Sequence, residues 1–242
     1  MQFRPLLLPT LVSIPALIIL LMLGTWQVQR LNWKTALIEQ YTARSQSDSL
    51  PITALKQPIE GSEFQRVGLT GRFAHDQEIY LTGRTYEGNA GFHVVTPFVD
   101  QTGRTFLVNR GWVSEAYRAP EQRAFSVIDE EISFDGIVRL PQRKGYFVPE
   151  NEPDNGFWFT LKPDEIAAHL GRDTLETAFY IDAVRGDEVI TLPIAAELKI
   201  DVSNPHLNYA MTWYGLALAL LGVYFAYHHG QGRLRFGAQQ DI

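Results

Sequence analysis

Residues 6–23 read LLLPTLVSIPALIILLML, and residues 209–227 read YAMTWYGLALALLGVYFAY. Neither stretch, of 18 and 19 residues respectively, contains a charged side chain. At about 1.5 Å per residue, a helix over the first stretch is roughly 27 Å long, close to the apolar thickness of a bilayer. The two stretches therefore predict a chain with two membrane-spanning helices.

A cleaved signal peptide is the alternative interpretation of the first stretch, because Arg4 supplies a positive charge before it. The apolar run is long for a signal peptide, and Gly24-Thr25-Trp26 is a poor site for cleavage. We therefore expect the stretch to remain as a helix. The second stretch has tyrosines at both ends, as membrane spans commonly do.

The basic residues suggest an orientation in the membrane. Arg233 and Arg235 follow the second stretch and favour cytoplasmic termini, although Arg30 and Lys34 lie on the other side of the first stretch. The expected division is a cytoplasmic N-terminus at 1–5, a first span at 6–25, a periplasmic domain at 26–205, a second span at 206–227 and a cytoplasmic tail at 228–242.

The composition of the central part excludes some classes of function. Residues 30–208 carry 18 Lys and Arg against 26 Asp and Glu, a net charge of −8, which argues against a nucleic-acid partner. The chain has no cysteine, so the domain has no disulfide and no thiolate for copper transfer or thiol exchange.

The pattern between the two apolar stretches predicts a β-rich α+β domain. β-branched and aromatic segments are separated by Gly, Pro, Asn or Asp, and residues 100–103 (DQTG) predict a hairpin loop. The first helix is expected to continue to about Thr42, and a short helix at 163–170 begins with proline and two acids and ends at Gly171. The expected strands are 64–73, 78–81, 92–98, 105–108, 132–138 and 178–182.

Known signatures of enzymes are missing from the sequence. There is no Walker loop, no GxSxG elbow, no HExxH and no Rossmann glycine fingerprint. The acidic clusters at 129–131 and 150–154 are typical of solvated turns, and His75, His93 and His169 lie in three separate segments. The sequence favours a protein that is not an enzyme, with a hydrolase of unknown chemistry as the weakest alternative.

Three residues after the first stretch share one helical face. Trp26, Arg30 and Trp33 are spaced by four and three residues. Interfacial tryptophans with a basic neighbour are ordinary membrane anchors. A guanidinium between two indoles also suits a flat anionic amphiphile, with carboxylates on the arginine and a macrocycle on the rings. Both interpretations stay open.

The start of the second helix carries a histidine. Asn204 is expected at the N-cap and Pro205 at the first helical position, which puts His206 in the first turn. The partial positive charge of a helix N-terminus favours neutral imidazole, the form that binds metals and commonly ligates heme iron. An interfacial capping or surface group is the ordinary alternative. His206 is expected to face the same side as Ala210, Trp213 and Ala217.

A series of motifs along nearly the whole chain resembles the Surfeit-locus (Surf/Shy) family of cytochrome c oxidase assembly proteins. They occur in family order from the first helix to the last. The motifs are Gly24-Thr25-Trp26-Gln27 with Arg30, Trp33 and Lys34; residues 91–98 (GFHVVTPF); residues 109–113 (NRGWV); residues 151–155 (NEPDN) leading to Trp158-Phe159; residues 204–210 (NPHLNYA); and Thr212-Trp213-Tyr214-Gly215.

The resemblance implies a two-helix protein of the bacterial or mitochondrial inner membrane that assists maturation of oxidase subunit I. Bacterial members are thought to bind heme a, and the family's proposed heme ligand corresponds to His206. Ser114 stands where proline is common and Tyr214 where phenylalanine is common, and neither departure touches that ligand. The short N-terminus with only Arg4 before the span resembles a bacterial member.

The leading hypothesis is a heme-handling chaperone with heme a held between the two helices. His206 is the expected axial ligand, Trp213 and Trp26 are expected ring contacts, and Arg30 is the expected propionate partner. The expected partners are oxidase subunit I, the heme a synthase and the lipid bilayer.

The rival hypothesis is a scaffold that stabilises an oxidase assembly intermediate and binds no heme. Small residues on the second helix support it, because membrane helices pack through such residues. They are Ala210, Gly215, Ala217, Ala219 and Gly222.

Arg110 and Trp112 lie in one of the family motifs. Asn109 and Gly111 are expected to shape a bulge or turn that orients the arginine. Stabilisation of the core is favoured for both residues over contact with heme or subunit I.

Overall fold

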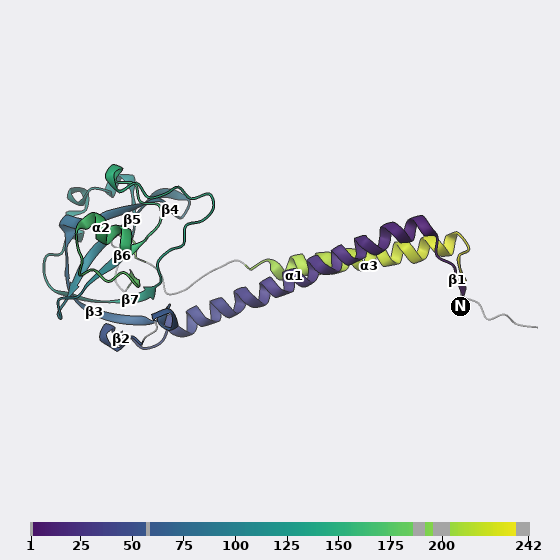
Figure 1. Ribbon diagram of the computed structural model, residues 1–242, viewed down its shortest axis with the longest axis horizontal. Coiled ribbons are helices and arrows are strands. Elements are labelled where there is room, and N and C mark those ends of the chain that lie inside the picture. The colour runs from purple at the N-terminus through teal and green to yellow at the C-terminus, as the bar shows by residue number, and fades with distance from the viewer. Residues whose placement is uncertain (1, 57–58, 186–191, 196–203, 236–242) are drawn as a thin grey trace, which may run out of the picture. The chain divides into compact units, whose positions relative to one another are not determined.

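The computed structural model describes residues 2–56, 59–185, 192–195 and 204–235 (Figure 1). The chain divides into two compact units. The helix unit comprises Met1–Glu39 and Asp201–Ile242, and the barrel unit comprises Gln40–Ile200. The long helix α1, Leu7–Ser45, begins in the helix unit, and its last residues belong to the barrel unit.

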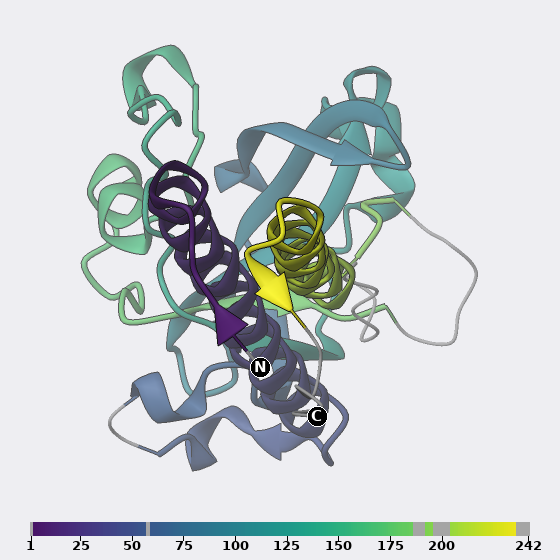
Figure 2. The ribbon, with the colours of Figure 1, turned by 90° about the vertical axis from the view of Figure 1, so that its right-hand side faces the viewer.

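The helix unit pairs α1 with α3, His206–Gly230, and the two lie side by side in both views (Figures 1 and 2). Each is long and apolar enough to cross a membrane, and only 6% and 11% of the respective apolar windows are buried within the protein. Outward apolar side chains suit contact with lipid rather than with water. The prediction of two long apolar helices is confirmed, and α1 ends at Ser45, three residues beyond the expected end near Thr42.

The two ends of the chain meet where α1 begins and α3 ends. Strand β1, Gln2–Phe3, pairs antiparallel with β9, Leu234–Arg235. Beside this pair, Nε2 of the fully buried His228 accepts the Leu6 N–H at 3.0 Å. Nδ1 of His228 donates to the Tyr224 carbonyl at 2.8 Å, because a carbonyl can only accept. One neutral imidazole therefore satisfies a backbone N–H at the start of α1.

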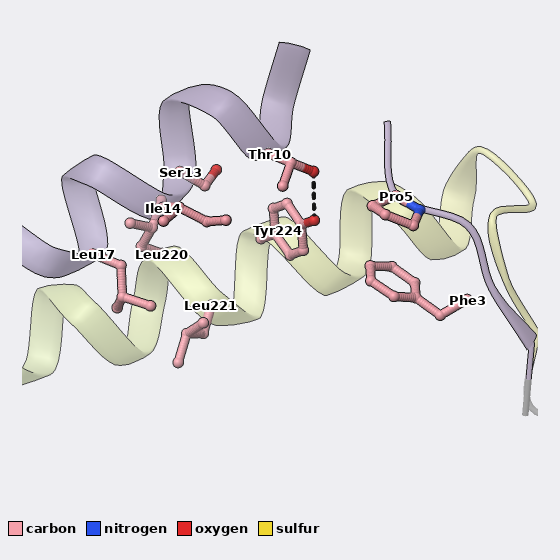
Figure 3. Close-up of a pocket in the computed structure, with 9 residues that line it drawn as sticks. All are labelled: Phe3, Pro5, Thr10, Ser13, Ile14, Leu17, Leu220, Leu221 and Tyr224. Carbon is pink, nitrogen blue, oxygen red and sulfur yellow. Dashed lines mark hydrogen bonds between the residues drawn. The ribbon is translucent and has the colours of Figure 1, made fainter. Parts of the chain in front are cut away.

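An apolar pocket of about 290 Å³ lies at the same end of the helix unit (Figure 3). The hydroxyls of Thr10 and Tyr224 are hydrogen bonded across it at 2.7 Å. This bond links the two helices where they are otherwise apolar. The lining residues are Phe3, Pro5, Thr10, Ser13, Ile14, Leu17, Leu220, Leu221 and Tyr224.

The barrel unit contains a seven-stranded mixed sheet, which confirms the prediction of a β-rich α+β domain. Every expected strand and the short helix α2, Pro163–Leu170, are present, and Gly171 ends that helix in the left-handed conformation at φ +62°. The strands are β2 (Leu50–Pro51), β3 (Arg66–Phe73), β4 (Ile79–Tyr86), β5 (Asn89–Asp100), β6 (Thr105–Ser114), β7 (Ile132–Arg139) and β8 (Tyr180–Ala183).

The predicted hairpin at residues 100–103 is also confirmed. It joins β5 to β6, and the carboxylate of Asp100 accepts the N–H groups of Thr102 and Arg104, both at 2.9 Å. An aspartate that bonds its own turn in this way is a common device for fixing a tight connection.

The sheet closes on itself, which the sequence pattern did not predict. Its strand order is β2-β3-β7-β8-β6-β5-β4, and β3 also pairs with β5. The five strands from β3 through β7, β8 and β6 to β5 therefore form a closed barrel, with β2 and β4 attached outside the ring. Closure leaves these five strands with no unpaired edge along the ring.

Alternating side chains divide the core into two clusters. On β6, Phe106 and Val108 belong to the first cluster, and Leu107 belongs to the second. The first includes Phe98 and Ile181, also from ring strands, and the second includes Ile166 of α2. The barrel interior and the surface covered by α2 thus use opposite faces of the same strands.

Candidate functional site

Helix α3 begins at His206 itself. Pro205 occupies the N-cap with φ −76° and ψ 3°, and its carbonyl accepts the Tyr209 N–H at 3.2 Å. The expected cap at Asn204 is wrong by one residue, because the helical bonding starts from Pro205. The Asn204 amide instead reaches the Thr35 hydroxyl on α1 at 3.5 Å. His206 is therefore the first residue of the helix, with its side chain half-buried.

The imidazole of His206 contacts α1. Its Nδ1 lies 2.7 Å from Oε1 of Gln27. An amide oxygen accepts and cannot donate, so Nδ1 carries a proton, and in the neutral ring Nε2 then keeps its lone pair. Within the described part of the chain, no hydrogen bond engages Nε2 of His206. A histidine that ligates a metal usually donates its other N–H to such an acceptor.

Gln27 lies on the face of α1 that packs against α3. Its exposed fraction is 9%, and Ala210 and Ala217 on α3 are 2% and 3% exposed. The face predicted for His206 thus agrees with the burial of both alanines, and Trp213 on the same face is half-buried.

Close packing fills the space between the helices one turn from Gln27. A Cβ at Gly24 would lie 2.7 Å from the Tyr214 ring, so any larger residue there would have to displace that ring. The Tyr214 hydroxyl also bonds Thr25 Oγ1 at 3.2 Å. A macrocycle does not fit between the helices at this level, because the tyrosine ring already occupies that space.

Trp26, Arg30 and Trp33 form the cation–π cluster predicted from their spacing. The Arg30 guanidinium carbon is 5.7 Å from the Trp26 ring centre and 5.5 Å from that of Trp33. The two rings are 48% and 59% exposed, so this face of α1 is turned outward. Trp26 also lines a shallow groove of about 480 Å³ together with Ile18, Leu21, Met22, Thr25 and Gln29.

The four residues nominated for heme binding fall into two groups. His206 and Trp213 lie on the packed face of α3, and Trp26 and Arg30 lie on the outward face of α1. Among the described residues, no hydrogen bond or ring contact joins one group to the other. A ligand that touches both groups therefore has to reach from the packed face of α3 to the outward face of α1.

In the barrel unit, the predicted bulge at the 109–113 motif is present. Val94 pairs with Gly111 and Val95 with Asn109, so Arg110 is the extra residue on β6. Gly111 has φ +121°, and a Cβ there would lie 2.1 Å from the Ile194 carbonyl oxygen. The bulge turns the Arg110 side chain into the protein, where it is 8% exposed.

Arg110 belongs to a buried charged network centred on Glu78. The Glu78 carboxylate accepts from Arg110 at 2.8 Å and from the fully buried Arg123, and His75 bonds it at 3.2 Å. Burial alone would raise the pKa of Glu78, but the bonds from His75 and Arg123 and the two arginine charges lower it to about 2. These contacts give Arg110 a role in stabilising the core.

Trp112 also packs into the barrel unit. It is 8% exposed, its ring lies 5.5 Å from that of Tyr86, and its indole N–H donates to the Arg84 carbonyl at 3.4 Å. A role in the core therefore accounts for Trp112 as well.

The remaining histidines of the barrel unit have structural partners. Asn109 bonds His93 at 3.3 Å, and burial together with the Arg84 charge lowers the pKa of His93 to about 4. His169 packs edge-on against the buried Trp158. Within residues 2–235 as far as the structure describes them, no three His, Cys, Asp or Glu side chains gather in a way that would hold a metal ion.

Two residues that matter to these clusters were not singled out from the sequence. Gln27 stood inside a quoted motif without a role, and Glu78 stood at the start of an expected strand. The available signal for Gln27 is its position three residues after Gly24, one helical turn along the same face. Glu78 gave no such signal, because its partners come from distant segments.

Comparison with known proteins identifies the family to which the chain belongs. The SURF1 family matches residues 14–218. Surfeit locus protein 1 of Rattus norvegicus is 34% identical over 218 residues, covering 84% of this chain and 70% of the relative. The Homo sapiens protein of that name is 34% identical over 219 residues, with 84% and 72% covered. A SURF1-like protein of Monosiga brevicollis is 32% identical over 226 residues, with 88% and 84% covered. The chain therefore belongs to the SURF1 family.

Proposed function

We propose that this protein is a non-enzymatic assembly factor for cytochrome c oxidase that handles heme a and assists its insertion into subunit I. The family membership and the motifs quoted above support the oxidase connection. The observation that carries the heme proposal is the His206–Gln27 contact, which engages Nδ1 and leaves Nε2 without a hydrogen bond among the described residues.

His206 is the proposed axial ligand, and Gln27 is the proposed positioning residue. The Gln27 oxygen holds the proton on Nδ1 and fixes the ring, so that Nε2 is the metal-binding atom. Heme iron accepts a histidine nitrogen readily, so the donor suits the group. A single histidine with no second strong ligand also favours release, which a carrier requires.

The remaining contacts of the proposed site combine one ring on the packed face of α3 with two side chains on the outward face of α1. Trp213 and Trp26 are the proposed ring contacts, and Arg30 is the proposed propionate partner. The stacking of Arg30 between two indoles supports this, because it orients the guanidinium while leaving the cluster exposed.

The proposed location is the inner membrane of a bacterium. Both helices are long and apolar enough to span it. Arg233 and Arg235 favour cytoplasmic termini, and this supports a proposed periplasmic location for the barrel unit.

The test is the absorption spectrum of the full chain purified in detergent from cells that make heme a. We expect a Soret band in the wild type, loss of most of it in His206→Ala, and retention in His229→Ala, the matched change at the other end of the same helix. A wild type without a Soret band, or a band unchanged in His206→Ala, contradicts the proposal.

A scaffold without heme is the second candidate function. Its specific support is that a Cβ added at Gly215 or Gly222 would meet no atom of the described residues within 4 Å, so a small-residue face of α3 is open to another helix. Replacing Gly222 by Leu would then impair oxidase assembly while leaving any Soret band intact. Loss of assembly in His206→Ala but not in Gly222→Leu would count against the scaffold.

A further inference from the structure

A loop in the barrel unit presents two aromatic rings at its tip. Residues 145–148 form a tight turn in which the Val148 N–H donates to the Gly145 carbonyl at 3.1 Å. Tyr146 and Phe147 occupy the two central positions and are 93% and 94% exposed. Their rings meet each other edge to face, with centres 5.0 Å apart. The pair is almost fully outside the protein.

Nothing in the folding of the barrel unit accounts for these rings. Central positions of exposed turns usually hold Gly, Pro, Asn, Asp or Ser, which suit water and tight backbone angles. Large apolar side chains that gather on the surface and contribute nothing to the core usually mark an interaction site. The two adjacent rings at this turn therefore indicate a contact surface for a binding partner.

The turn is held in place by its flanks. Lys144 and Glu150 form an ion pair across its base. Next along the chain, the Asn151 side-chain oxygen accepts the N–H groups of Phe159 and Thr160 at 2.8 and 2.9 Å. The rings are thus carried on an anchored loop rather than on a loose segment.

The basic residues lie on the N-terminal side of the turn. Arg139, Arg143 and Lys144 precede it with no acidic residue among them, whereas the acidic residues Glu150, Glu152 and Asp154 follow it. Arg143 and Lys144 are both exposed and directly precede the turn. A basic flank beside aromatic rings is complementary to a surface of anionic phosphates.

We propose that residues 143–148 form a membrane-contact loop, in which Tyr146 and Phe147 enter the headgroup region and Arg143 and Lys144 meet lipid phosphates. The same chain carries two helices able to span the bilayer, so the domain is tethered beside that surface and weak contacts suffice. Amphipathic rings with basic neighbours are the usual composition of interfacial contacts. A protein partner is less favoured, because protein hot spots usually lie near the centre of an interface, surrounded by further contacts that exclude water. The proposal does not depend on heme binding.

The absence of cysteine makes a site-specific test direct. The full chain with Phe147→Cys, labelled with the fluorophore NBD, is placed in nanodiscs of phosphatidylcholine with phosphatidylglycerol. We expect blue-shifted emission and protection from aqueous iodide. The matched control, Glu130→Cys in an exposed loop of the same unit, is expected to behave as in water.

The charge component is tested in the same labelled chain. Each basic residue near an anionic surface contributes about 1 kcal/mol. Arg143→Gln and Lys144→Gln should therefore each reduce the ratio of loops in contact with lipid to loops in water by about fivefold. Far-UV circular dichroism checks that the variants remain folded, and Tyr146→Ser should weaken the blue shift without either charge change.

Two results would overturn the proposal. One is a label at 147 that is as accessible to iodide in anionic nanodiscs as the label at 130. The other is protection that arises only after purified oxidase subunit I is added, which would assign the loop to a protein partner instead.

Discussion

The Glu78 network in the barrel unit and the His206–Gln27 pair in the helix unit both bury polar side chains, but they satisfy them differently. Glu78 receives bonds from two arginines and a histidine, so its charge is fully engaged. His206 uses one nitrogen on Gln27, and among the described residues no hydrogen bond engages the other. A buried network in which every polar group has a partner stabilises a fold, whereas a reversible binding site needs a side chain with one polar atom still unbonded.

The largest expected effect comes from opening the closed network. Glu78→Ala leaves Arg110 and Arg123 buried without their counter-charge and should cost about 3–5 kcal/mol of stability in the barrel unit. Urea unfolding of the full chain in micelles, followed by tryptophan fluorescence, measures it. Glu130→Ala, an exposed carboxylate of the same unit, should change little. An equal loss of unfolding free energy in the two variants would mean that the buried network does not stabilise the fold.

Acid should weaken the same network more gently, because protonation keeps the shape of the side chain. The folded pKa of Glu78 is about 2, below the ordinary 4.5, so its contribution is complete above pH 4.5 and is lost between 4.5 and 2. His93, with its pKa lowered from 6.5 to about 4, starts the decline at pH 6.5. Urea titrations at several pH values should show this slope, and Glu78→Gln should flatten its lower part. An unaltered lower slope in that variant would refute the assignment to Glu78.

The His206–Gln27 pair is tested by removing the hydrogen-bond acceptor, Gln27. Gln27→Leu takes away the partner of His206 Nδ1 and should lower heme affinity by about 10- to 100-fold while the helices remain paired. Gln40→Leu, at an exposed position farther along the same helix, is the matched control and should bind heme like the wild type. Gln27→Glu retains an acceptor and should restore most of the affinity. If the wild type binds heme and all three variants bind it equally, Gln27 has no positioning role.

The smallest expected effect concerns Arg30. An exposed ion pair is worth at most about 1 kcal/mol, so Arg30→Gln should weaken heme binding by no more than about fivefold. Titration with hemin and with its dimethyl ester separates charge from packing. The loss should occur with hemin and disappear with the ester, whose propionates carry no charge. The same loss with both would assign Arg30 to packing on the indoles.

Much of the fold could be predicted because its signals are local. The uncharged runs, the alternating strands and the proline and glycine at the two ends of α2 each depend on neighbours in sequence. The cluster of Trp26, Arg30 and Trp33 follows in the same way from helical spacing. Even the Arg110 bulge could be expected from the glycine beside it.

The rest depends on contacts between distant segments. Closure of the barrel requires β3 to pair with two strands, which no local pattern encodes. Glu78 meets Arg123 only after the intervening strands are in place, and Gln27 meets His206 across 179 positions of sequence. The misplaced cap at Asn204 has a local cause, because Pro205 itself adopts a conformation from which the helix can start.

The bond between His228 and Leu6 joins residues 222 positions apart, and this separation has a consequence for synthesis. Chains grow from the N-terminus at about 5–20 residues per second, so α1 is made roughly 10–40 s before its partner histidine exists. During that interval the start of α1 lacks its cap, and Gly24 faces no tyrosine. The first helix must therefore remain without its partner while the whole barrel unit is translated. Completion of α3 is the event that locks both ends of the pair.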